Sequence, residues 1–222
     1  MKFTVVRDAD ELARRAASIV AETVLALPST RLALAGGSTP LACYRLLAKR
    51  RDLPWGRVSV FFSDERCVPA EHADSNYRAA LDVLLRHVDP GAVHRIAGEL
   101  GAEAAAALYA PAVAAAPLDL VLLGIGPDGH TASLFPGNAA LDAAGYVAAV
   151  HDAPKPPPDR VTLTVRALRQ ARRVVLLAAG SEKADAVGRA RAGEVPAGLI
   201  AHTEWILSED AATKLQEQGA RT

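Results

Sequence analysis

Short apolar runs recur along the chain, separated by longer stretches in which apolar residues return every three or four positions. The runs are bounded by proline, glycine or charged residues, which is typical of strands buried on both faces of a parallel sheet. They predict strands at residues 3–6, 31–35, 58–63, 118–123, 161–165, 174–178 and 204–207. The last of these is expected to be an edge or closing strand.

The stretches with helical spacing predict helices at residues 10–27, 41–50, 76–85 and 101–116, another after residue 183, and a short one at the C-terminus. Ser38 or Thr39 is the expected N-cap of the second helix, with Pro40 in its first turn. Strands that alternate with helices favour a three-layer α/β/α fold with a mostly parallel, Rossmann-like sheet. Because strand patterns resume after the proline-rich segment 155–160, residues 1–222 are expected to form a single domain.

Composition narrows the possible partners. The chain has 222 residues, half of them hydrophobic, and 25 basic residues balance 25 acidic ones. This neutral balance argues against a nucleic-acid partner, although a few cations can still gather in one pocket. No apolar run approaches the ~20 residues of a membrane helix, and the N-terminus lacks a signal-peptide core. We therefore expect a cytoplasmic protein, monomeric or weakly homo-oligomeric, with Cys43 and Cys67 as small buried hydrophobes.

The loop after residues 118–123 carries the strongest chemical signal. The chain turns there on glycines and presents Asp128 and His130 just beyond the strand. Ligands bind at the carboxyl ends of strands in open α/β sheets. A histidine beside a carboxylate on a rigidly held loop suits proton transfer, although two ordinary polar turn residues are the alternative.

Three further sets of polar residues follow other predicted strands or lie on adjoining loops. The first set, Gly36, Gly37, Ser38 and Thr39, would let the backbone approach an anion closely, although it matches neither the Walker A nor the dinucleotide-binding glycine motif and a plain strand-to-helix turn is equally compatible. In the second set, Asp64 and Arg66 would face a cleft with Glu65 pointing away, unless the segment is a solvated loop. In the third set, the guanidinium fork of Arg160 and the ammonium of Lys183 would bind one phosphate, unless both cations lie on the surface.

Other chemistries find little support in the sequence. No group of cysteine, histidine or carboxylate residues has metal-ligand spacing, so no metal is expected. Ser133 lacks the surroundings of a nucleophilic serine. Asn76 is compatible either with the cleft or with a structural role at a helix start.

Four segments together resemble the family that contains the 6-phosphogluconolactonases and the glucosamine-6-phosphate deaminases. They are residues 34–40, 63–77, 124–137 and 155–164, in this order along nearly the whole chain. The resemblance implies the fold shared by that deaminase, ribose-5-phosphate isomerase and the CoA-transferases. It also implies a small phosphosugar lactone as substrate, hydrolysed in the oxidative pentose phosphate pathway without metal or organic cofactor.

One position separates the two branches of this family. The deaminases carry a glutamate five residues after the loop histidine, where it assists opening of the sugar ring. Phe135 occupies that position here and cannot carry a proton, which favours the lactonase branch. The alternatives are a deaminase-like enzyme and a non-catalytic sugar-phosphate-binding domain, as in transcription regulators, but no basic helix-turn-helix is present.

The lactonase interpretation gives each candidate residue a role. His130 would activate water and later protonate the ring oxygen, with Asp128 orienting it. Arg66, or a pair of backbone N–H groups, would stabilise the carbonyl oxygen, while Asp64 would bind sugar hydroxyls. The phosphate would lie on the glycine loop with Arg160 and Lys183.

Overall fold

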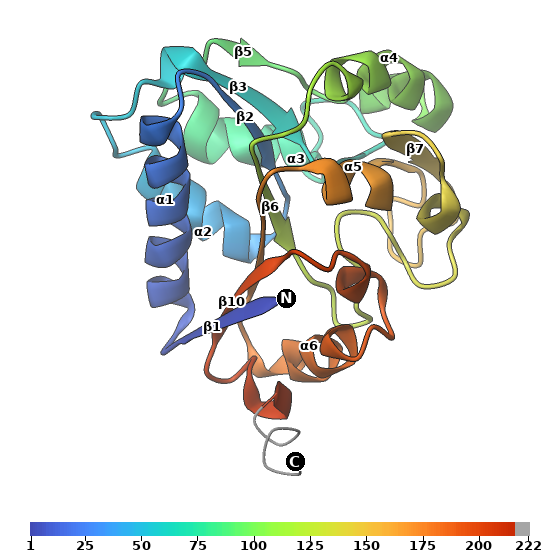
Figure 1. The fold of residues 1–222 in the computed structure, drawn as a ribbon. Helices are drawn as coiled ribbons and strands as arrows, with labels where there is room; N and C mark the ends of the chain where they lie inside the picture. Colours follow the sequence, from blue (N-terminus) through green and yellow to red (C-terminus); the bar gives the residue numbers. More distant parts are fainter. Residues whose placement is uncertain (216–222) are drawn as a thin grey trace.

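A seven-stranded sheet forms the centre of the molecule, in a computed structural model that describes residues 1–215 (Figure 1). All neighbouring strands pair in parallel, in the order β1-β10-β9-β6-β2-β3-β5. The strands are β1 Lys2–Val6, β2 Thr30–Leu34, β3 Val58–Phe62, β5 Ala92–Val93, β6 Leu120–Gly124, β9 Val174–Ala178 and β10 Glu204–Ser208. The sequence prediction of a mostly parallel sheet is confirmed.

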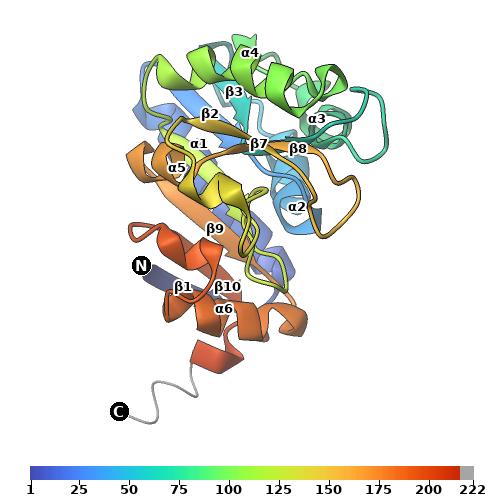
Figure 2. The same ribbon diagram turned by 90° about the vertical axis from the view of Figure 1, so that its right-hand side faces the viewer.

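Helices and a second, small sheet cover the two faces. The helices α1 and α2 pack together against one face, while α4, α5, α6 and the small sheet lie on the other (Figures 1 and 2). The helices are α1 Ala9–Ala26, α2 Ser38–Leu47, α3 Asn76–Ala80, α4 Ala102–Ala114, α5 Val165–Gln170 and α6 Ala184–Arg191. The predicted three layers are therefore present, and no helix among residues 1–215 is long and apolar enough to cross a membrane.

The small sheet is antiparallel and was not predicted as a unit. Its strand order is β4-β8-β7, with β4 Asp64–Arg66, β7 Val147–Val150 and β8 Arg160–Leu163. The charged segment 64–66 is thus a strand rather than a solvated loop, and Arg66 lies opposite Arg160 in its register. The predicted strand 161–165 ends at Leu163, and Val165 begins α5.

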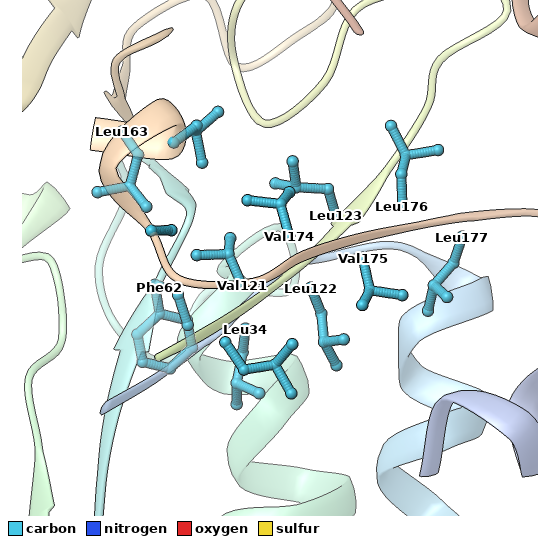
Figure 3. Close-up of a cluster of buried hydrophobic side chains, with 14 of the residues drawn as sticks. Leu34, Phe62, Val121, Leu122, Leu123, Leu163, Val174, Val175, Leu176 and Leu177 are labelled. Atoms are coloured by element: carbon cyan, nitrogen blue, oxygen red, sulfur yellow. The ribbon is translucent and has the colours of Figure 1, made fainter. Parts of the chain in front are cut away.

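The core consists of strand side chains that project from both faces of the large sheet. Figure 3 shows Val174 and Leu176 pointing to one side of β9, and Val175 and Leu177 to the other. All four are at most 1% exposed, so this strand is buried on both faces as its unbroken apolar run predicts. Each such side chain contributes about 1.5–3 kcal/mol through burial.

The predicted N-cap of α2 is wrong. The N-cap of α2 is Gly37, at φ +99°, and neither Ser38 nor Thr39 caps the helix with its side chain. A side chain is disfavoured at that backbone angle, so glycine suits the position. The predicted helix 76–85 is confirmed in its bounds, as α3 continued from residue 81 by a π-helical turn.

The last strand, β10, pairs with both β1 and β9 and is interior rather than at an edge. Its burial by β1 could not be inferred locally because the N-terminal strand comes from the opposite end of the chain. The predicted C-terminal helix falls largely on residues 216–222, outside the described residues.

The strand order sets the place where a ligand can bind. From β2 the chain proceeds outward through β3 to β5, and then returns to β6 on the other side of β2 before continuing to β9. The direction of the connections therefore reverses between β2 and β6. A crevice forms outside the carboxyl ends of strands at such a switch point.

Candidate active site

A pocket of about 310 Å³ lies at the switch point between β2 and β6. Nine of the ten side chains or glycines that the sequence analysis singled out line it: Gly36, Gly37, Ser38, Thr39, Asp64, Arg66, His130, Arg160 and Lys183. The tenth, Asp128, contacts His130 from outside the lining. Segments that lie far apart in the sequence thus meet around one cavity.

His130 and Asp128 form a hydrogen-bonded pair beyond the end of β6. The His130 Nδ1 atom lies 2.5 Å from Asp128 Oδ1. A carboxylate can only accept a hydrogen bond, so a neutral imidazole in this pair carries its proton on Nδ1. The lone pair is then on Nε2, which can act as a base.

The environment keeps this imidazole neutral at physiological pH. Burial lowers the pKa of His130 below its ordinary value of 6.5, although the hydrogen bond and the charge of Asp128 act in the opposite direction. Burial alone would raise the pKa of Asp128, but its interactions with His130 outweigh that effect and the pKa is lowered. The pair therefore consists of an ionised carboxylate and a histidine that is free to accept a proton.

The glycines of the loop make room for this pair. A Cβ atom at Gly126 would lie 2.1 Å from the His130 ring and 2.5 Å from Asp128 Oδ1. The loop is closed by two hydrogen bonds: Gly126 N donates to His130 O at 2.9 Å, and Thr131 Oγ1 donates to Gly124 O at 2.8 Å. Gly126 is thus required for the close approach of the backbone to both side chains.

Phe135 packs against both the histidine and an arginine. The residue is 2% exposed, and its ring centroid lies 4.6 Å from that of His130. The guanidinium carbon of Arg160 is 5.3 Å from the same ring centroid. The aromatic ring therefore packs the imidazole and supports the arginine through a cation–π contact.

Asp64 is a buried carboxylate held by several donors. Its Oδ2 accepts a hydrogen bond from Ser133 Oγ at 2.7 Å, and its Oδ1 accepts bonds from Ser63 Oγ and Asn76 Nδ2, both at 3.1 Å. Asn76 also lines the pocket, and it touches Gly36, where a Cβ atom would lie 2.0 Å from its Oδ1. This network fixes the orientation of Asp64 at the pocket wall.

Glu65 points away from the pocket and has a structural role. Its carboxylate accepts hydrogen bonds from the backbone N–H groups of Asn76 at 2.7 Å and Tyr77 at 2.8 Å, and from Ser75 Oγ at 3.0 Å. These bonds anchor the start of α3. Burial raises the pKa of the Glu65 carboxyl above its ordinary value. The carboxylate therefore brings Asn76 to the pocket.

The start of α2 offers N–H groups to the cavity. Gly37 precedes the helix, and Ser38 and Thr39 are its first residues. The first N–H groups of a helix have no partner within it. They can bind an anion together with the positive end of the helix dipole.

Four cationic side chains line the pocket, but only one carboxylate, that of Asp64.

Arg160 directs most of its guanidinium group to its own loop, since Nε donates to Pro157 O at 3.0 Å and Nη2 to Lys155 O at 2.9 Å. Among residues 1–215 only its Nη1 is left for a ligand, so the fork predicted to face a phosphate is largely occupied. Burial and the neighbouring Arg66 lower the pKa of Arg160.

The other two predicted cations are arranged differently. Arg66 donates from Nη1 to Asp74 O at 2.6 Å, and its buried Nε has no partner among the described residues. Lys183 follows β9 and comes no closer than 4.0 Å to the exposed carboxylate of Glu182. Both cations are therefore incompletely neutralised within residues 1–215.

Two pocket features were missed or left open by the sequence analysis. Lys155 lines the cavity although it was noted only as part of a motif, and Ser133 serves as a donor to Asp64. Both depend on tertiary contacts that spacing along the chain does not reveal. Within residues 1–215, no three histidine, cysteine or acidic side chains are grouped so that they could hold a metal ion.

The fold and the pocket together define an α/β protein with a cationic cleft and a His–Asp pair at the switch point of a parallel sheet. The chain belongs to the family described as glucosamine-6-phosphate isomerases/6-phosphogluconolactonase, whose profile matches residues 7–208.

Three relatives show how closely this chain follows the family. It is 38% identical over 226 residues to the 6-phosphogluconolactonase of Mycobacterium leprae, covering 91% of this chain and 92% of the relative. It is 36% identical to that of Streptomyces coelicolor, covering 96% and 94%. The solved structure of the 6-phosphogluconolactonase from Thermotoga maritima superposes with a TM-score of 0.86 at 30% identity, covering 94% of this chain and 99% of that one.

Proposed function

We propose that this protein hydrolyses 6-phospho-D-glucono-1,5-lactone to 6-phospho-D-gluconate, in the oxidative pentose phosphate pathway of the cytoplasm. The observation that carries the proposal is the His130–Asp128 pair in a pocket where cations outnumber carboxylates. A lactone needs a base to activate water, and an anionic phosphate needs positive charge. The names of the family members support the same substrate.

The reaction begins at His130. Its neutral Nε2 takes a proton from water as the water oxygen forms a bond to C1 of the lactone. The C1=O electron pair moves onto the carbonyl oxygen. When this pair returns, the bond between C1 and the ring oxygen breaks, and the imidazolium gives its proton to the departing oxygen. Asp128 stabilises the imidazolium between the two steps through the bond to Nδ1.

The rest of the pocket binds and orients the substrate. The N–H groups at the start of α2, with Lys183 and the free donor of Arg160, hold the phosphate. Asp64 accepts bonds from sugar hydroxyls, because its own orientation is fixed by Ser133 and Asn76. Binding of the phosphate thereby places C1 against the water activated by His130.

A deaminase reaction fits the pocket less well. Phe135 is an apolar, buried ring packed on His130, at the position where the sequence resemblance places a proton-carrying glutamate in the deaminases. Ring opening of an amino-sugar phosphate would lack that group here.

A direct assay separates the two activities. Freshly prepared 6-phosphogluconolactone is supplied to the wild-type protein, and 6-phosphogluconate formation is followed with a coupled dehydrogenase, with the spontaneous hydrolysis subtracted. We expect enzyme-dependent turnover of the lactone and no ammonia release from glucosamine 6-phosphate. Ammonia release without lactone hydrolysis would overturn the proposal.

A further inference from the structure

Lys155 is a pocket cation without a neutralising partner among residues 1–215. It lines the cavity that also contains His130, and its side chain is exposed. None of the ion pairs formed among residues 1–215 includes it. An unpaired ammonium group in a cavity is available to an anionic group of the ligand.

The backbone of Lys155 is tied to the catalytic pair through two side chains. Arg160 Nη2 donates to Lys155 O at 2.9 Å, and the same guanidinium lies over the ring of Phe135. That ring in turn packs on His130, at a centroid distance of 4.6 Å. This chain of contacts sets the loop beside the imidazole, although residues 155 and 130 lie far apart in the sequence.

The base of the loop is also closed. His151 Nδ1 lies 2.8 Å from Asp159 Oδ1, and Ala153 N donates to Pro158 O at 3.0 Å. Lys155 therefore extends from a loop that is held at its base and again at the arginine.

Charge interactions agree with a position near the reacting end of the pocket. Burial is the main cause of the lowered pKa of His130; Asp128 and Asp64 raise this pKa, and the charge of Lys155 lowers it further. Arg66, which the sequence analysis favoured for the carbonyl oxygen, also lines the pocket, and it uses its Nη1 to donate to Asp74 O.

We propose that Lys155 is a catalytic residue whose ammonium group stabilises the negative charge on the lactone carbonyl oxygen. This inference rests on the proposed lactonase function. As water adds to C1, the C1=O electron pair moves onto the oxygen and forms an ion pair with the Lys155 ammonium. When the carbonyl is restored and the ring C–O bond breaks, His130 supplies the proton to the ring oxygen. Lys155 stays protonated throughout and supplies only charge.

Lys155→Met tests the proposal through kcat and its pH dependence. We expect kcat for 6-phosphogluconolactone to fall about 10²-fold or more, as when one oxyanion donor is removed. The acid limb of the kcat/KM profile is expected to move to higher pH, because removing a positive charge raises the pKa of His130. Lys155→Arg keeps the charge and is expected to keep the acid limb in place.

Inorganic phosphate distinguishes this role from phosphate binding. As a competitive inhibitor, it is expected to bind the Lys155→Met variant within about twofold of wild type. Lys49→Met, which removes an exposed lysine outside the pocket, is the matched control and is expected to leave kcat, KM and the pH profile unchanged. Thermal unfolding verifies that each variant is folded.

Two results would overturn the inference. One is an unchanged kcat and pH profile in a folded Lys155→Met variant. The other is a weaker phosphate inhibition constant with kcat preserved, which would assign Lys155 to the phosphate. A wild-type protein that fails to accelerate lactone hydrolysis would instead remove the proposed function itself, so the two failures are distinguishable.

Discussion

At the scale of single residues, Gly126 shows how closely the backbone must approach the catalytic pair. A methyl group there would overlap both the His130 ring and the Asp128 carboxylate, at 2.1 and 2.5 Å. Gly126→Ala is therefore expected to displace the pair and to lower kcat at least tenfold, since small misplacements of catalytic groups cost about 10²-fold. Steady-state kinetics measure this effect. Gly56→Ala, where the added atom meets nothing within 4 Å and φ is likewise not positive, is the matched control. Equal kcat in wild type and Gly126→Ala would contradict the geometry.

At the scale of elements, two buried tyrosines secure the ends of neighbouring strands. The Tyr44 hydroxyl accepts from Ala35 N at 2.9 Å and donates to Ala35 O at 3.0 Å, just after β2. Tyr109 does the same for Phe62 at the end of β3. Both strands lead directly into pocket segments, so the two hydroxyls hold the frame of the site.

Tyr44→Phe is expected to lower the free energy of unfolding by about 1–3 kcal/mol, because it leaves buried backbone groups of Ala35 unpartnered. Chemical denaturation measures this loss. Tyr146→Phe is the control: its hydroxyl bonds the exposed Gln170 side chain at 2.9 Å, and we expect a change within about 0.5 kcal/mol. Equal stabilities of the two variants would show that the Ala35 bonds contribute little.

The elements also show what could be predicted from the sequence. Strands such as β9 are buried on both faces, so their apolar runs reveal them directly. The small sheet was not predicted because β4 consists of the charged residues Asp64, Glu65 and Arg66, and the partners that hold the two carboxylates come from other segments of the chain. Most candidate site residues were recognisable because they follow strands, whereas the place of Lys155 depends on the contacts of Arg160 and Phe135.

At the scale of the whole molecule, a chain with no net charge concentrates positive charge in one pocket. The fold achieves this by bringing together cations from β4, from β8 and the loop before it, and from the segment after β9. Lys183→Met is expected to raise KM for the phosphorylated lactone by about 10- to 100-fold, since a hydrogen bond to a charged group contributes about 1.5–3 kcal/mol. The kcat is expected to change little. The KM for unphosphorylated glucono-1,5-lactone provides the internal control, and an equal rise for both lactones would place Lys183 away from the phosphate.

The central claim is that His130 is the base that activates water. Its most direct test is the kcat of His130→Ala on freshly prepared 6-phosphogluconolactone, after subtraction of spontaneous hydrolysis. General base catalysis predicts a fall of about 10²- to 10⁴-fold relative to wild type, with the fold retained. Turnover within a few-fold of wild type would contradict the account.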